Sequence, residues 1–139
     1  PHAVHFPDLE LEVWGQPHTH YNDMSPLADP RGRTTKWQVA MAHGHYMEDS
    51  EPTPKFGYSW AIRDSAIQAT GADYVALGHW NRPTKVGAGI VPAYYSGSPE
   101  LGGSVNVVRF RDGTAVQVER CYFNGVASDE EDPPGSAST

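Results

Sequence analysis

Two apolar runs, each followed by a histidine beside a glycine, constrain this chain more than any other feature. Residues 39–42 precede His43, and residues 74–77 precede Gly78 and His79. Short apolar runs that end at glycine are typical of buried strands. Two such strands lying side by side place both histidines at one edge of a sheet, where α/β proteins often keep their binding sites. The repeated pattern therefore predicts a site built from two strand ends.

The segment between these runs has the period of a helix. Apolar residues recur over residues 58–69 at the spacing of an amphipathic helix: Trp60, Ile62, Ala66, Ile67 and Ala69. Ser59 is a candidate N-cap of this helix, and Gly71 a candidate C-cap. A strand, helix, strand order of these lengths predicts a crossover between parallel strands of an α/β fold.

Further strands are expected on both sides of this unit. Residues 9–14 alternate apolar and charged side chains, which predicts a strand with Leu9 facing inward and Glu12 facing solvent. The run 36–42 is apolar enough to be buried on both faces. Other strands are expected at 90–95, 105–110 and 115–122, the last two joined by a hairpin turn at Asp112-Gly113. The chain is thus predicted to be strand-rich α/β with one clear helix.

Composition narrows the classes of function. A length of 139 residues suits one domain, and no apolar run approaches the ~20 residues of a membrane helix, so no membrane partner is expected. The net charge of -7 argues against broad electrostatic capture of nucleic acid. A lone cysteine, Cys121, forms no internal disulfide, which favours a reducing compartment and predicts a cytoplasmic protein. Residues 127–139 are expected to form an acidic, polar tail.

Histidines also occur in two His-x-His pairs, His18/His20 and His43/His45. On a strand, residues i and i+2 share a face and can chelate one transition-metal ion. The first pair falls in a long loop and the second straddles a glycine, so neither is a clean strand chelate. A single ion held by His18 and His20 on a β-rich barrel remains an alternative, and it predicts strands in place of the helix.

Three pieces of sequence follow one another in a specific order. They are Ala42-His43-Gly44 at a strand end, the strand and turn at 73–83, and the segment Tyr94-Tyr95-Ser96-Gly97-Ser98-Pro99-Glu100. Over about residues 36–122, this order resembles the C-terminal half of the calcineurin-like metallophosphoesterases, most closely the SbcD-like branch of DNA-repair nucleases. The resemblance implies that residues 1–126 are the C-terminal part of such a domain, half of a four-layer α/β/β/α sandwich.

The resemblance implies a dinuclear metal centre. His43 and His79 would bind one of two transition-metal ions, which would be Mn, Fe or Zn. Asn81 stands where the family's Gly-His-x-His motif has its second histidine. It either binds the other ion as a weaker ligand or only caps the turn. Whether the site holds one ion or two therefore depends on whether Asn81 is a ligand.

The implied activity is hydrolysis of a phosphoester by a metal-activated water. His45 would meet the substrate or protonate its leaving group. Trp80 and Arg82 flank the metal turn and would contact the substrate, with Arg82 pairing with a phosphate oxygen. The substrate class stays open among nucleic acids, cyclic nucleotides and phosphomonoesters.

The family's N-terminal ligand motifs have no counterpart in these 139 residues. The chain is therefore expected to supply half of the site, with the other half on a missing N-terminal segment or a partner chain. Unpaired sheet edges also favour a homo-oligomer. The alternative is a non-catalytic binding or structural domain derived from such an enzyme, which predicts no stoichiometric metal and no turnover.

Overall fold

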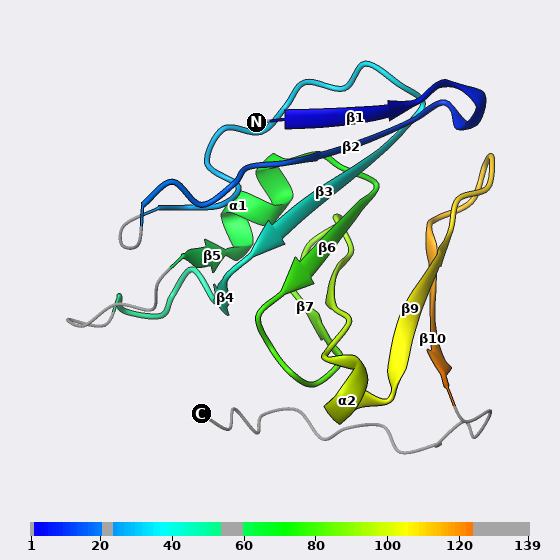
Figure 1. Cartoon of the computed structure of the whole chain (residues 1–139). Helices are drawn as coiled ribbons and strands as arrows, with labels where there is room; N and C mark the ends of the chain where they lie inside the picture. Colours follow the sequence, from blue (N-terminus) through cyan, green and yellow to red (C-terminus); the bar gives the residue numbers. More distant parts are fainter. Residues whose placement is uncertain (1, 21–23, 54–59, 124–139) are drawn as a thin grey trace.

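The computed structural model describes residues 2–20, 24–53 and 60–123. Strands hold 41% of these residues and helices 12%, so the fold is a strand-rich mixed sheet with few helices (Figure 1). In chain order the elements are β1 (His2–Phe6), η1 (Pro7–Leu9), β2 (Leu11–Gly15), β3 (Trp37–His43), β4 (His45–Met47), β5 (Ala61–Arg63), α1 (Asp64–Ala69), β6 (Tyr74–Gly78), β7 (Thr84–Val86), β8 (Ala93–Tyr95), α2 (Pro99–Gly102), β9 (Ser104–Arg109) and β10 (Gln117–Tyr122).

The main sheet has six strands in the order β1-β2-β3-β6-β8-β7. Its four central strands are parallel, and the edge strands β1 and β7 run antiparallel to their neighbours. The chain leaves β3, passes through β4, β5 and α1, and returns as β6 beside β3 (Figure 1). The predicted crossover between two parallel strands is therefore confirmed.

The crossover helix is shorter than predicted. Residues 61–63 form β5, paired in parallel with β4, and the helix begins only at Asp64 with Arg63 in the N-cap position. The predicted cap Ser59 lies outside the described residues. Gly71 has φ +57 directly after the helix, in the left-handed conformation that a C-terminal glycine commonly adopts. A helix over 64–69 also contradicts the barrel alternative, which needed strands there.

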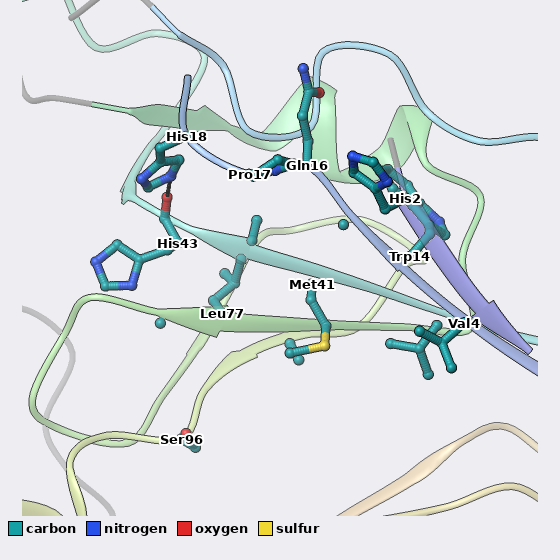
Figure 2. Close-up of a pocket in the computed structure, with 15 residues that line it drawn as sticks. His2, Val4, Trp14, Gln16, Pro17, His18, Met41, His43, Leu77 and Ser96 are labelled. Atoms are coloured by element: carbon teal, nitrogen blue, oxygen red, sulfur yellow. Dashed lines mark hydrogen bonds between the residues drawn. The ribbon is translucent and has the colours of Figure 1, made fainter. Parts of the chain in front are cut away.

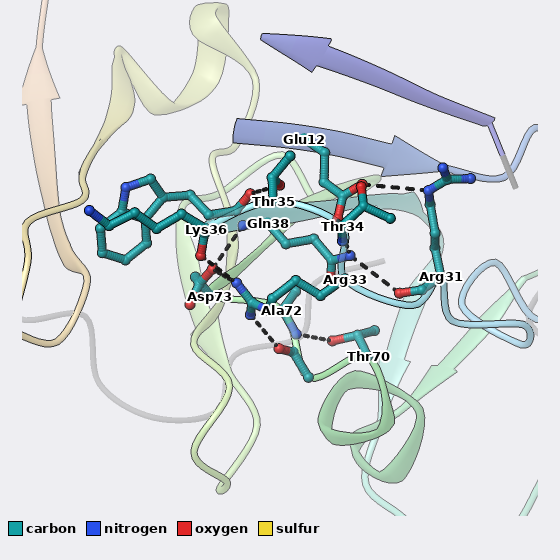
Figure 3. A network of polar contacts seen from close by, with 12 residues as sticks. Glu12, Arg31, Arg33, Thr34, Thr35, Lys36, Gln38, Thr70, Ala72 and Asp73 are labelled. Carbon is teal, nitrogen blue, oxygen red and sulfur yellow. Dashed lines mark hydrogen bonds and ion pairs between the residues drawn. The ribbon is translucent and has the colours of Figure 1, made fainter. Parts of the chain in front are cut away.

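The core lies between α1 and one face of the sheet, and it includes Trp14. Glu12, predicted to face solvent, is fully buried on this same face, whereas Leu9 lies in η1 and is 62% exposed. Burial of Glu12 is possible because its carboxylate accepts hydrogen bonds from the Thr34 N–H, the Thr34 hydroxyl and the Gln38 amide, at 2.8, 2.8 and 2.9 Å (Figure 3). The predicted inward and outward faces of this strand were wrong.

The opposite face of the sheet is apolar and partly open. Val4 pairs with Val13 across β1 and β2, and Met41 lies on the same face of β3. Val4 is 59% exposed and Met41 53% exposed, so β3 is not buried on both faces as predicted. The hairpin β9–β10 covers another part of this face, where Phe110 packs 5.5 Å from the ring of Trp37.

Other predicted strands are found with different limits. The run expected at 90–95 is a strand only over β8, and the one expected at 115–122 begins at Gln117. β9 and β10 pair antiparallel as predicted, with Gly113 at φ +69 in the turn. The sequence reasoning missed β1, η1, β4, β7 and α2. The predicted tail at 127–139 lies outside the described residues.

No helix in the described part of the chain is long and apolar enough to cross a membrane.

Candidate metal-binding site

His43 and His79 meet at the carboxyl ends of two neighbouring strands. His43 ends β3 and pairs in register with Gly78, the last residue of β6, so His79 emerges beside it. The two imidazole centroids are 5.3 Å apart at an interplanar angle of 76°. A Cβ at Gly78 would lie 3.2 Å from His43 Nδ1, so glycine lets the ring approach the backbone closely. The predicted strand ends therefore do bring these two histidines together.

Two more imidazoles extend this pair. His18 Nε2 donates a hydrogen bond to the His43 carbonyl oxygen at 2.8 Å (Figure 2). The ring of His18 also stacks on Trp60 at a centroid distance of 3.7 Å. On the other side, the His45 ring lies 6.0 Å from that of His79. His18, His43, His79 and His45 thus form a continuous row of rings.

His20, the other half of the His-x-His pair in the loop, does not share this arrangement with His18. Its Nδ1 lies 3.0 Å from the hydroxyl of its neighbour Thr19, within hydrogen-bond distance.

The surroundings favour the neutral form of two of these imidazoles, His43 and His45. Partial burial, with the nearby rings of His79 and His18, lowers the pKa of His43 below its usual value. Burial and His79 likewise lower the pKa of His45, although Glu51 opposes this shift. A neutral imidazole has the free lone pair that a metal ligand needs, so at neutral pH the ring of His43 is suited to bind Zn, Fe or Mn.

The backbone of His79 is held in an unusual conformation. Its φ is +128°, a region that residues with a Cβ rarely adopt. Such conformations cost about 1–3 kcal/mol and gather at functional sites. The residue with this strained backbone is the one that the sequence predicts to be a metal ligand.

The turn after His79 is fastened to the segment that follows β8. The carbonyl oxygen of Asn81 accepts a hydrogen bond from the Ser98 N–H at 2.9 Å. A Cβ on Gly97 would lie 2.8 Å from that oxygen and from Pro83, and Gly97 has φ +76. Arg82 is exposed. The turn and the Tyr-Ser-Gly-Ser-Pro segment, both singled out in the sequence, are therefore packed against each other.

Trp80 turns inward from the same turn. Its ring stacks on Tyr95 at a centroid distance of 4.4 Å, and its indole N–H donates to His45 Nδ1 at 3.1 Å. The fully buried Tyr95 in turn donates its hydroxyl to the Gly44 carbonyl at 2.7 Å and accepts from the Tyr46 N–H at 2.8 Å. Neither the contact to His45 nor the role of Tyr95 was expected from the sequence.

An open groove runs from His18 and His43 along the apolar face of the sheet (Figure 2). Among the residues that the structure describes, its lining contains no aspartate, glutamate, lysine or arginine. The lining residues are His2, Val4, Val13, Trp14, Gly15, Gln16, Pro17, His18, Met41, Ala42, His43, Ala76, Leu77, Gly78 and Ser96.

The donor set is suitable for a transition metal but incomplete. Within residues 2–20, 24–53 and 60–123, no group of three or more His, Cys, Asp or Glu side chains is arranged to hold a metal ion. His43 and His79 therefore offer two nitrogen donors, where a bound ion in a protein commonly has three or more protein ligands. No family model, no curated protein and no solved structure matches this chain.

Proposed function

We propose that this chain forms part of a metal-dependent phosphoesterase, in which His43 and His79 hold one Mn, Fe or Zn ion. The observation that supports this function is the approach of the two rings to 5.3 Å at the ends of parallel strands. The resemblance of residues 36–122 to the metallophosphoesterases supports the reaction class. When bound, the metal would activate a water for attack on phosphorus.

The chain's own residues would hold and orient the reactants. His18 steadies the end of β3 through the carbonyl of His43, and the strained backbone of His79 directs its ring to the same point. Arg82, exposed beside the turn, can pair with a phosphate oxygen. Asn81 is proposed either to bind a second ion or to hold the turn through its carbonyl, the contact described above.

The remaining ligands must come from outside the described residues. The open apolar face beside His43 is suited to pack against another layer of protein, because exposed apolar patches commonly mark interfaces. An N-terminal segment, a partner chain or a second copy of this chain would each complete the four-layer sandwich that the resemblance implies. The incomplete donor set also favours one other function, a non-catalytic domain that acts through binding alone.

Metal titration followed by calorimetry, with hydrolysis of an aryl phosphodiester, tests the proposal. The wild-type chain is expected to bind Mn²⁺ or Zn²⁺, and His43→Ala and His79→Ala should each weaken binding more than tenfold, since loss of supporting groups alone costs 10–100-fold. His20→Ala is the control and should bind normally. No binding by the wild type would favour the non-catalytic alternative, and loss of binding in His20→Ala would mean that His43 and His79 alone do not define the site.

The strain at His79 gives a second prediction. His79→Gly is expected to lose metal binding and yet to gain about 1 kcal/mol in stability, because glycine adopts positive φ freely. His79→Ala should lose the metal without that gain. Urea denaturation of the two variants measures the difference. If His79→Gly is less stable than His79→Ala, then the positive φ at position 79 does not cost stability, and the prediction of a strained backbone is wrong.

A further inference from the structure

The contact between Trp80 and His45 has a donor and an acceptor that are fixed by chemistry. An indole nitrogen can only donate a hydrogen bond. Because Trp80 Nε1 lies 3.1 Å from His45 Nδ1, the Nδ1 atom must be the acceptor and carry the lone pair. A neutral His45 ring therefore carries its proton on Nε2.

The position of the indole is itself constrained. Trp80 stacks on Tyr95 at an interplanar angle of 12°, and Tyr95 is fully buried. The Tyr95 hydroxyl bridges the Gly44 carbonyl and the Tyr46 N–H, the residues on either side of His45. The backbone of His45 is also fixed, since its N–H donates to the Trp60 carbonyl at 3.1 Å. Both partners of the contact are thus held by the same buried tyrosine.

We propose that Trp80 is a positioning residue that fixes His45 in the tautomer protonated at Nε2. His45 then serves as a hydrogen-bond donor to a substrate oxygen, and it does not bind metal through Nε2. The donor role of His45 extends the proposed phosphoesterase function and rests on it. The assignment of the tautomer does not depend on that function.

The division of roles within the row follows from these contacts. The His45 ring lies 6.0 Å from His79, close enough for one phosphoryl group to meet both residues. A ring that keeps its proton on Nε2 offers an N–H to an oxygen of that group. His79 and His43 would supply lone pairs to a bound metal ion. The chemistry that His45 recognises is therefore a phosphoryl or leaving-group oxygen.

Nitrogen NMR of the histidine side chains tests the tautomer directly in the metal-free wild-type chain. At a pH where the rings are neutral, His45 Nδ1 is expected to resonate as an unprotonated nitrogen and Nε2 as a protonated one. In Trp80→Phe, which keeps the stacking on Tyr95, the two signals should move towards the average of mixed tautomers. Trp60→Phe, which removes an indole that donates to the His20 carbonyl, is the matched control and should leave them unchanged.

A second readout separates this inference from the proposed function. If the wild type hydrolyses the phosphodiester, Trp80→Phe should lower kcat about tenfold while metal affinity is unchanged. His45→Gln, whose amide N–H reaches further than that of asparagine, should retain more activity than His45→Asn. A protonated Nδ1 in the wild type, or unchanged His45 signals in Trp80→Phe, overturns the inference. A correct tautomer without any turnover in the wild type overturns the donor role and the proposed function, and leaves Trp80 with positioning alone.

Discussion

Replacing Gly44 with alanine is expected to abolish metal binding and to destabilise the fold by about 3 kcal/mol. A Cβ at this position would lie 2.1 Å from the Trp60 carbonyl oxygen and 3.1 Å from Ile62 Cδ1. The closest atom belongs to the backbone, so the clash cannot be relieved by rotating a side chain. The two chain segments must move apart, and the hydrogen bond from the His45 N–H to the Trp60 carbonyl must break.

The expected loss of metal binding follows from the position of Gly44 in the chain. It directly follows His43 and its own N–H donates to the Gly78 carbonyl at 3.1 Å, so it ties the end of β3 to the end of β6. Any shift at Gly44 therefore separates His43 from His79. Urea denaturation and Mn²⁺ titration measure the two effects.

Gly32→Ala provides the matched control. A Cβ there meets no atom within 4 Å. Stability should stay the same or rise by about 0.4–1 kcal/mol, because alanine restricts the unfolded chain. Metal binding should be unaffected. A Gly44→Ala variant that unfolds at the wild-type urea concentration would mean that the strand ends are not packed in this way.

The strands that carry the site were predictable from the sequence because they lie at the centre of the sheet. A central parallel strand has neighbours on both sides and reads as a continuous apolar run, as residues 39–42 and 74–77 do. The glycine beside each histidine marks where each run ends. These local signals were enough to predict that His43 and His79 would meet.

The helix limits could not be predicted by the same means. Trp60 and Ile62 fit a helical period together with Ile67, yet Ile62 belongs to β5 and only Ile67 to α1. A short strand followed by a short helix gives the same apolar spacing as one longer helix. Pairing of β5 with β4 decides between them, and periodicity holds no information on that pairing.

The contacts of Trp80 and Glu12 were missed for a related reason. Trp80 meets His45 across 35 residues of chain, and Glu12 meets Thr34 and Gln38 across 22 and 26. Alternation along one strand shows which side chains share a face, but the choice of the inward face depends on such distant partners. Three donors converge on the Glu12 carboxylate, and they make its burial possible.

Because these donors converge on Glu12, Glu12→Gln is the second substitution that we expect to change stability strongly. The variant is expected to lose about 3 kcal/mol of stability at pH 7, because removing one partner from a buried, hydrogen-bonded charged network leaves the others without compensation. The Thr34 N–H, the Thr34 hydroxyl and the Gln38 amide would face a side chain that carries a donor of its own. Arg31, whose Nε lies 3.5 Å from the carboxylate, would lose its charge partner (Figure 3).

The pH dependence separates this effect from a packing defect. Burial alone would raise the pKa of Glu12, but hydrogen bonds from Thr34 and Gln38 and the charge of Arg31 lower it from 4.5 to about 2. A carboxylate with a lowered pKa stabilises the fold fully above pH ~4.5, and this contribution disappears as the pH falls to about 2. At about 1.4 kcal/mol per pKa unit, it amounts to roughly 3 kcal/mol.

Urea denaturation of the wild type and of Glu12→Gln at pH 7, 4 and 3 measures this contribution. The difference in unfolding free energy between the two should shrink steadily as the pH falls below 4.5. Glu10→Gln changes a carboxylate two residues away that is exposed and lies 4.0 Å from Lys36, and it should cost less than about 1 kcal/mol at every pH. A constant difference for Glu12→Gln from pH 7 to pH 3 would assign its effect to altered shape and not to the charge of the carboxylate.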